Sequence, residues 1–223
     1  MKINILVDNN TFIDEYYFGE PALSMLIEDQ DEKILFDMGY SDIFLQNAKI
    51  KGINLSEMTK IVFSHGHNDH TRGMSFLSKS SGLFGKSVYA HPLFLNSKRY
   101  EKLDIGSPKS TEWVSNKFDL NLQKEPIKLT NKIWYLGEIG QYTAFEEREA
   151  IGEYFVNNQW EDDYVMDDTA MVYETDEGLF IITGCSHSGI CNICEHAKKV
   201  TGTNKILGIC LLYTSPSPRD YAA

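Results

Sequence analysis

A run of apolar residues that ends in a cluster of metal-binding side chains constrains this chain more than any other feature. The run Ile61-Val-Phe-Ser64 leads directly into His65-Gly-His-Asn-Asp-His70, which places three of the six histidines and one aspartate within six positions. Gly66 lets the backbone turn tightly between the first two histidines. Imidazole and carboxylate groups suit Zn²⁺ and also Fe²⁺ or Mn²⁺. The spacing therefore predicts a buried strand that delivers a short loop of metal ligands.

This loop has enough donor groups for two adjacent ions. We expect His65 and His67 to hold one ion and Asp69 and His70 to face the other. Our catalytic candidates are Asp69, His70 and, outside this loop, Asp37. Of these, Asp69 can accept a proton from the attacking nucleophile as a carboxylate beside the ion. The alternative is a histidine-rich surface loop, but the position directly after a strand favours metal binding.

An aspartate at the end of a second expected strand is placed to hold one of the ligand histidines. The segments 23–27 and 33–36 are typical of a hairpin, and Asp37-Met-Gly39 follows at once. There Asp37 can accept an N–H from a ligand histidine and fix the tautomer of that histidine. The alternative is a turn or helix-capping aspartate.

A third strand end carries the most distant expected ligand. The segments 170–174 and 179–183 form another predicted hairpin, and its second strand runs into Gly184-Cys-Ser-His187-Ser-Gly189. A histidine held between glycines at a strand end repeats the arrangement of the first loop. His187 is therefore our candidate for the distant metal ligand, in preference to a plain buried histidine.

Other candidate side chains keep alternative interpretations. Asp168 can hold a metal together with His65 and His67, and His91, which stands before a proline at the end of the expected strand 87–90, can be a ligand, a substrate contact or a structural residue. Cys191-x-x-Cys194 can be a redox pair or half of a metal site, although on a helix such a pair more often packs inward.

Two charged or aromatic stretches, 93–131 and 145–163, show few clear periods and predict surface excursions, the second of them a possible lid. Such segments are natural places for substrate contacts. Lys98, Arg99 and Lys109 can meet an anionic substrate there, while the alternative is a solvated face.

Composition limits the classes of partner. With 223 residues and 42% hydrophobic residues, one domain is expected. The net charge of −11 argues against a nucleic-acid groove, because phosphate binding needs clustered Lys and Arg. The apolar run at the amino terminus is too short for a signal peptide, and none approaches the roughly 20 residues that span a bilayer. We therefore expect a cytoplasmic protein with a small-molecule substrate and no membrane partner; the oligomeric state is open.

The pattern His-x-His-x-Asp-His resembles the signature of the metallo-β-lactamase superfamily. The resemblance narrows to the branch of metal-dependent hydrolases related to the dihydropterin–ribofuranosylaminobenzene-phosphate synthase of methanopterin synthesis, on four further segments: Leu35-Phe-Asp-Met-Gly39, Tyr89-Ala-His-Pro92, Asp167-Asp-Thr-Ala170 and Thr183-Gly-Cys-Ser-His-Ser-Gly189. It implies an α/β fold, the αβ/βα sandwich, with one or two metal ions at its edge. Zn²⁺ is the expected ion, with Fe²⁺ and Mn²⁺ as alternatives.

The same resemblance implies a metal-dependent hydrolase, in which a metal-activated water attacks a small ester, lactone or phosphoester. Two other reactions fit the fold: a pterin-transferring synthase of the methanopterin type and a non-haem iron redox enzyme. The chain also departs from the family pattern. It lacks a Gly-His-x-x-Gly motif between the two metal loops, and Cys185 stands where many relatives have a bridging aspartate. Asp168 or His187 can fill these vacancies.

The carboxyl end of the chain departs further from the family pattern. In the branch that it resembles, the last strand leads into a Gly-Gly-Phe-His loop that supplies another metal-site histidine, but here Cys210-Leu-Leu-Tyr-Thr-Ser-Pro-Ser-Pro-Arg-Asp220 follows. Codons for this tail look like the transposase-end adapter of sequencing libraries. We therefore expect a metallo-β-lactamase-like domain over residues 1–208, truncated at its carboxyl end, and a non-native tail over residues 209–223.

Overall fold

Six strands with apolar residues on both faces form the first sheet. The computed structural model describes residues 1–212. The strands of the first sheet lie in the order β1 (Lys2–Val7), β2 (Ser24–Asp29), β3 (Glu32–Phe36), β4 (Lys60–Val62), β5 (Ser87–Ala90) and β8 (Asp119–Leu122). The first three strands are antiparallel, and the strands from β3 to β8 are parallel. Parallel pairing brings the carboxyl ends of β3, β4 and β5 to one edge.

A second sheet packs face to face against the first. Its strands lie in the order β15 (Ile206–Cys210), β14 (Gly178–Thr183), β13 (Ala170–Thr175), β10 (Ile133–Tyr135) and β9 (Ile127–Lys128). Met25, Ile27 and Phe36 of the first sheet meet Met171 and Ile182 of the second in one buried cluster. Burial of such side chains drives the two sheets together.

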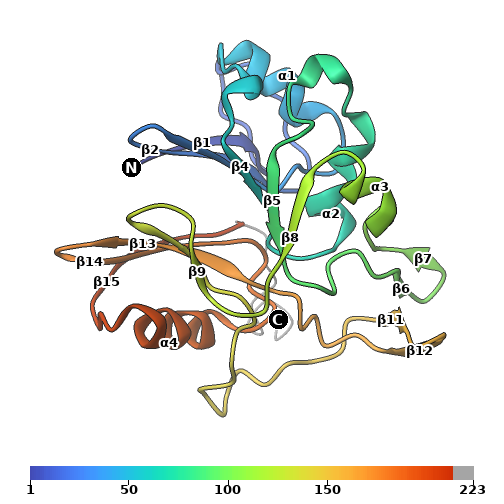
Figure 1. Ribbon diagram of the computed structural model, residues 1–223, viewed down its shortest axis with the longest axis vertical. Helices are drawn as coiled ribbons and strands as arrows, with labels where there is room; N and C mark the ends of the chain where they lie inside the picture. Colours follow the sequence, from blue (N-terminus) through green and yellow to red (C-terminus); the bar gives the residue numbers. More distant parts are fainter. Residues whose placement is uncertain (213–223) are drawn as a thin grey trace.

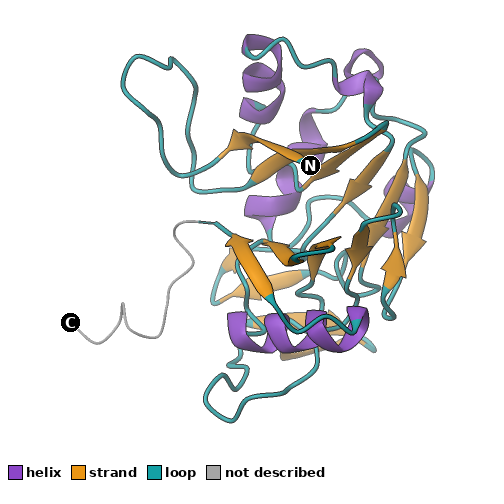
Figure 2. Cartoon of the chain, turned by 90° about the vertical axis from the view of Figure 1, so that its left-hand side faces the viewer, coloured by secondary structure: helices purple, strands orange, loops and turns teal. Residues whose placement is uncertain are grey.

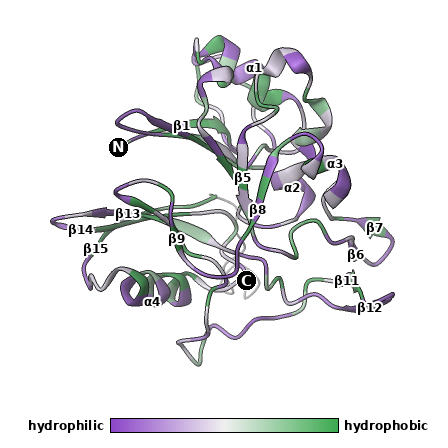
Figure 3. Cartoon of the chain, in the orientation of Figure 1, coloured by the Kyte–Doolittle hydropathy of each residue, from purple (hydrophilic) through white to green (hydrophobic). Residues whose placement is uncertain are grey.

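Helices cover the outer face of each sheet (Figure 1). On the first sheet lie α1 (Ile43–Ile50), the short α2 (Asn68–Thr71) and α3 (Thr111–Ser115), while α4 (Ile190–Thr201) lies under the second. Short 3-10 turns occur at Leu55–Glu57, Arg72–Phe76 and Lys79–Ser81. The hydropathy colours of Figure 3 show α4 with both apolar and polar positions, and its Ile193 and Ala197 pack on the second sheet. This is the expected αβ/βα sandwich. None of the helices among residues 1–212 is long and apolar enough to cross a membrane.

The two stretches predicted as surface excursions contain more regular structure than expected. The strands β12 (Gln159–Asp162), β11 (Glu153–Val156), β6 (Lys98–Tyr100) and β7 (Leu103–Asp104) form a third, small sheet, and β8 belongs to the first sheet. The prediction of loops was wrong here because the strands are short and their partners distant: Tyr154 pairs with Lys98. Pairing of this kind leaves little local period in the sequence.

The strand and helix predictions around the site are confirmed. The hairpins β2–β3 and β13–β14 and the core strand β4 form where expected, and the segment with Cys191 and Cys194 is the helix α4. Figure 2 shows α4 lying along the outer side of the second sheet. The expected domain boundary after residue 208 falls inside β15, whose Ile209 pairs with Ile181. The non-native origin of residues 209–223 stays a prediction, and most of that tail, residues 213–223, lies outside the described residues.

Candidate metal centre

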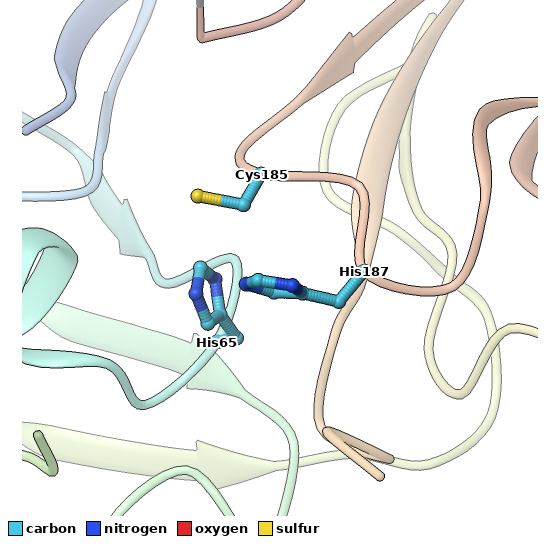
Figure 4. A group of neighbouring side chains, drawn as sticks. All are labelled: His65, Cys185 and His187. Atoms are coloured by element: carbon cyan, nitrogen blue, oxygen red, sulfur yellow. The ribbon is translucent and has the colours of Figure 1, made fainter. Parts of the chain in front are cut away.

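Two loops from opposite sheets meet at the edge where their strands end. The loop after β4 carries His65, and the loop after β14 carries Cys185 and His187; Figure 4 shows these three side chains directed toward one another. The imidazole rings of His65 and His187 lie 4.8 Å apart between their centroids, and those of His67 and His187 lie 5.0 Å apart. The sandwich therefore brings together donor groups that are more than a hundred positions apart in the sequence.

The donor atoms form three overlapping groups, and within each group all atoms lie within 4.8 Å of one another. Nε2 of His65 lies 3.1 Å from Nδ1 of His67, and Nε2 of His70 lies 3.2 Å from Oδ2 of Asp69. The three groups are His65, Cys185 and His187; His65, His67 and Asp69; and Asp69, His70 and Cys185. Because Asp69, Cys185 and His65 each belong to two groups, the arrangement suits neighbouring ions that share ligands.

Two imidazole nitrogens have no other role within the described part of the chain. Nε2 of His67 and Nε2 of His187 are buried and have no hydrogen-bond partner among residues 1–212. Leaving a buried polar atom without a partner is costly, and most such atoms in proteins are satisfied. A metal ion bound by imidazole nitrogen, carboxylate and thiolate fits both atoms, so the residues present match the group that the sequence predicts.

The protonation of the first two histidines also suits a ligand role. Burial, followed by the positive charge of His70, holds the pKa of His65 well below its usual value. Burial and the neighbouring His187 lower the pKa of His67 to about 3. Both imidazoles are therefore neutral at pH 7, which is the form that binds a metal.

The remaining donors form a mutually compensating set of charges. Although burial raises it, contact with His70 lowers the pKa of Asp69 to about 2. Burial raises the pKa of the Cys185 thiol, but the neighbouring His70 and His187 lower it by more, so the pKa of this thiol is below its usual value. Conversely, burial lowers the pKa of His70, but the charges of Asp69, Cys185 and Asp37 raise it well above its usual value. A carboxylate and a thiolate are thus favoured beside cationic imidazoles, and a bound cation would take the place of those protons.

Asp37 makes the contact that the sequence predicted for it. Its Oδ2 lies 2.6 Å from Nδ1 of His70, and its two oxygens accept hydrogen bonds from the backbone N and Oγ of Ser64 at 2.8 and 2.7 Å. Asp37 is fully buried at the end of β3 with a left-handed φ of 57°. The contact holds Nδ1 of His70 against a carboxylate and leaves Nε2 facing Asp69 and Cys185; once a metal displaces the Nε2 proton, the remaining proton would stay on Nδ1.

Asp168 lies beside the second loop without entering any of the three donor groups. Its Oδ2 accepts hydrogen bonds from the backbone N of Ser188, at 2.9 Å, and from Oγ of the same residue. Its Oδ1 is buried and has no partner within the described chain. Coordination of a metal by Asp168 together with His65 and His67 stays a prediction.

His91 holds a defined structural contact. Its Nδ1 accepts a hydrogen bond from the backbone N of Leu93 at 3.2 Å, and its Nε2 lies 3.0 Å from Oε2 of Glu138. Both ring nitrogens are therefore engaged, which favours the structural alternative for this residue. Cys185 is the opposite case: the sequence left its role open, yet the structure places it in two donor groups. The signal was its position two residues before His187 at the same strand end.

The three basic residues considered for an anionic substrate are engaged elsewhere. Lys98 is buried and pairs with two aspartates, so neither the solvated face nor the substrate contact applies to it. Arg99 pairs with Glu153 and lies over the ring of Trp160, and Lys109 lies over the ring of Trp113. Cys191 and Cys194 belong to none of the donor groups, and Cys194 packs against the buried cluster under α4.

Comparison with known proteins agrees with the fold and the geometry. The family model described as the metallo-beta-lactamase superfamily matches residues 17–198. The chain is 32% identical over 210 residues to an uncharacterized protein of Methanocaldococcus jannaschii, a match that covers 92% of this chain and 77% of the relative. It is 30% identical over 233 residues to the 7,8-dihydropterin-6-methyl-4-(beta-D-ribofuranosyl)-aminobenzene-5'-phosphate synthase of the same organism, covering 94% of this chain and 76% of the relative.

Solved structures of the same superfamily also resemble the fold of this chain. A metal-dependent hydrolase of the beta-lactamase superfamily matches with a TM-score of 0.78 and 26% identity, over 99% of this chain and 80% of that chain. A quorum-quenching N-acyl homoserine lactone lactonase matches with a TM-score of 0.53 and 11% identity, over 88% of this chain and 83% of that chain, and shares the fold. The chain belongs to the metallo-beta-lactamase superfamily.

Proposed function

We propose that the protein is a metal-dependent hydrolase that acts on a small ester, lactone or phosphoester. The observation that carries the proposal is the convergence of four histidines, an aspartate and a cysteine from two loops, in groups whose donor atoms lie within 4.8 Å. When bound, Zn²⁺ supplies hydroxide at neutral pH and stabilises the negative charge that develops on the attacked group. Fe²⁺ and Mn²⁺ suit the imidazole and carboxylate donors as well, but the thiolate of Cys185 favours zinc.

The chain's own residues divide into ligands, a proton acceptor and a positioning residue. In this proposal His65, His67, Asp69, His70, Cys185 and His187 hold metal, with Asp168 as a further candidate. The side chain of Asp69 is 28% exposed whereas that of His70 is fully buried, so Asp69 is the group that can reach the nucleophile and accept its proton. Asp37 is fully buried and acts through His70 by orienting its ring.

A pterin-transferring synthase is the second candidate, and the observation that favours it is the 30% identity to the synthase named above. Four aromatic residues, Tyr142, Phe145, Phe155 and Trp160, are candidates to stack on a flat pterin ring, but they are only partly available. Phe145 is 75% exposed, but Phe155 and Trp160 meet edge to face, and the hydroxyl of Tyr142 is hydrogen-bonded to Nδ1 of His196. A ring would therefore find Phe145 as the open aromatic surface.

Metal analysis and turnover test the proposal together. The purified protein should contain at least one zinc per chain after expression in zinc-supplemented medium, and it should hydrolyse a generic phosphodiester, an aryl ester or a lactone in a manner abolished by a chelator. Turnover of a pterin pyrophosphate with none of these substrates would support the synthase instead. Iron in the purified protein together with oxygen consumption would support a redox enzyme. Protein that binds no divalent metal would contradict the proposal.

A further inference from the structure

A buried lysine joins the small third sheet to the metal loop. Nζ of Lys98 lies 2.7 Å from Oδ2 of Asp163 and 2.8 Å from Oδ1 of Asp167. The three side chains are 1%, 4% and 1% exposed. Lys98 comes from β6, and its partners lie 65 and 69 residues further along the chain. A charge that is excluded from water in this way must be paired, and here one ammonium serves two carboxylates.

Each carboxylate uses its other oxygen to hold a backbone N–H. Oδ2 of Asp167 accepts from the backbone N of Gly66 at 2.7 Å, and Oδ1 of Asp163 accepts from the backbone N of Val165 at 2.8 Å. Val165 is a β-branched residue with a left-handed φ of 49°, a conformation that surrounding contacts must impose. Through these two bonds one lysine fixes two loops. One of them is the loop that carries His65 and His67.

The metal loop has little freedom to settle in another place. A Cβ on Gly66 would overlap the backbone carbonyl of Phe94, so the loop lies directly against that segment. The backbone N of Asn68 donates to the carbonyl of Ile105, which follows β7, at 2.8 Å. The third sheet therefore contacts the metal loop by backbone as well as through Lys98. A small displacement of Gly66 would move the two histidines on either side of it.

We propose that Lys98 and Asp167 are positioning residues for the metal centre: the ion pair holds Asp167 where it fixes the backbone of Gly66, and so sets the separation of the ligands His65 and His67. Asp163 belongs to the same ion-pair cluster but holds Val165, not the metal loop. The inference rests on the proposed metal site. The proposal gives the third sheet, which contains Lys98, a role in metal affinity.

The matched variants Asp167→Asn and Asp163→Asn test this inference. Each replaces one buried carboxylate of the same ion-pair cluster with an isosteric amide, so both should lower the unfolding temperature. Zn²⁺ affinity, measured by competition with a chromogenic chelator, should fall about 10–100-fold in Asp167→Asn, as is typical of residues that support metal ligands. In Asp163→Asn it should change by less than a few fold. The absorption spectrum of bound Co²⁺ should shift in the first variant only.

Lys98→Arg supplies the conservative rescue, because it keeps the charge and should retain more Zn²⁺ affinity than Lys98→Met. Equal Zn²⁺ affinity in Asp167→Asn and the unchanged protein would overturn the inference while leaving the proposed function intact. Absence of Zn²⁺ binding in the unchanged protein would contradict the proposed function itself. Hydrogen exchange of the unchanged protein needs no variant: the amide of Gly66 should be as protected as the core strands, and rapid exchange there would also overturn the inference.

Discussion

The two loops that meet at the proposed metal centre contribute their candidate ligands in different ways. The first places four donor residues within six positions, whereas the second contributes only Cys185 and His187. The first is held from outside, by Asp167 and by the carbonyl of Ile105. The second is held by its own turn, in which the carbonyl of Ser186, a residue with a φ of 60°, accepts from the backbone N of Gly189, and by Asp168, which accepts from Ser188. The comparison indicates that the first loop forms the body of the site and the second completes it.

The largest expected difference comes from removing one histidine from each loop. His65 belongs to two of the three donor groups and His187 to one. His65→Ala should therefore leave a single complete group and lower Zn²⁺ affinity by more than the ~100-fold reached by supporting residues. His187→Ala should leave two groups and retain more metal. Metal content after dialysis against a weak chelator measures both. Equal retention would remove the distinction between the loops.

Replacing one glycine of each loop with alanine should show which loop has the less adaptable surroundings. A Cβ at Gly66 would overlap the backbone of Phe94, whereas a Cβ at Gly184 would meet the side-chain Oγ of Ser64. Because a backbone cannot rotate away, we expect Gly66→Ala to lower the free energy of unfolding by about 3 kcal/mol. Gly184→Ala should cost about 1 kcal/mol. Urea unfolding of the metal-free proteins measures both losses in the free energy of unfolding. A larger loss in Gly184→Ala than in Gly66→Ala would contradict the prediction.

Neutralising the buried aspartate beside each loop should have a smaller and unequal effect on metal binding. Asp37 contacts His70 directly, whereas Asp168 contacts the backbone and hydroxyl of Ser188. Asp37→Asn should weaken Zn²⁺ binding about 10–100-fold, because the amide no longer holds the ring of His70 as a carboxylate does. Asp168→Asn should weaken it less. A loss in Asp168→Asn as large as that in His187→Ala would instead show that Asp168 is a ligand.

The smallest effect is expected from exchanging the sulfur donor of the second loop for oxygen. Cys185→Ser keeps the size of the side chain but removes the soft ligand, so affinity for Zn²⁺ should fall by roughly 10-fold while affinity for Mn²⁺ changes little. Paired titrations with the two ions provide the measurement. An equal loss for both ions would mean that the thiol of Cys185 acts through packing and not as a ligand.

Local spacing accounts for what the sequence could predict. The donors of the first loop are adjacent in the chain, and Asp37 and His187 stand at ends of clearly apolar strands, so their positions followed from strand geometry. Most strands of the two main sheets were predictable for the same reason, since they carry strong apolar patterns, but β8 and β9 lie in the stretch 93–131 that was predicted as a surface excursion. The face-to-face packing itself was expected from the resemblance to a known family.

Distant partners account for what the sequence could not predict. The ring of His91 contacts Glu138, which lies 47 residues further along the chain, and no neighbouring residue in the sequence indicates that contact. In the sequence Lys98 resembles other charged residues of a surface segment, yet it is buried and pairs with Asp163 and Asp167, which lie 65 and 69 residues further along the chain. Cys185 is a single cysteine whose direction depends on the turn at Ser186. In each case tertiary structure decided a role that the residue type left open.

The central claim is that the two loops hold a common metal centre. Crystals of the zinc-loaded protein, measured at the zinc absorption edge, test it most directly. We expect an anomalous peak about 2.0–2.3 Å from an imidazole nitrogen of the first loop and from His187 or the sulfur of Cys185 in the second. A protein that binds zinc with no peak within coordination distance of either second-loop residue would contradict the claim.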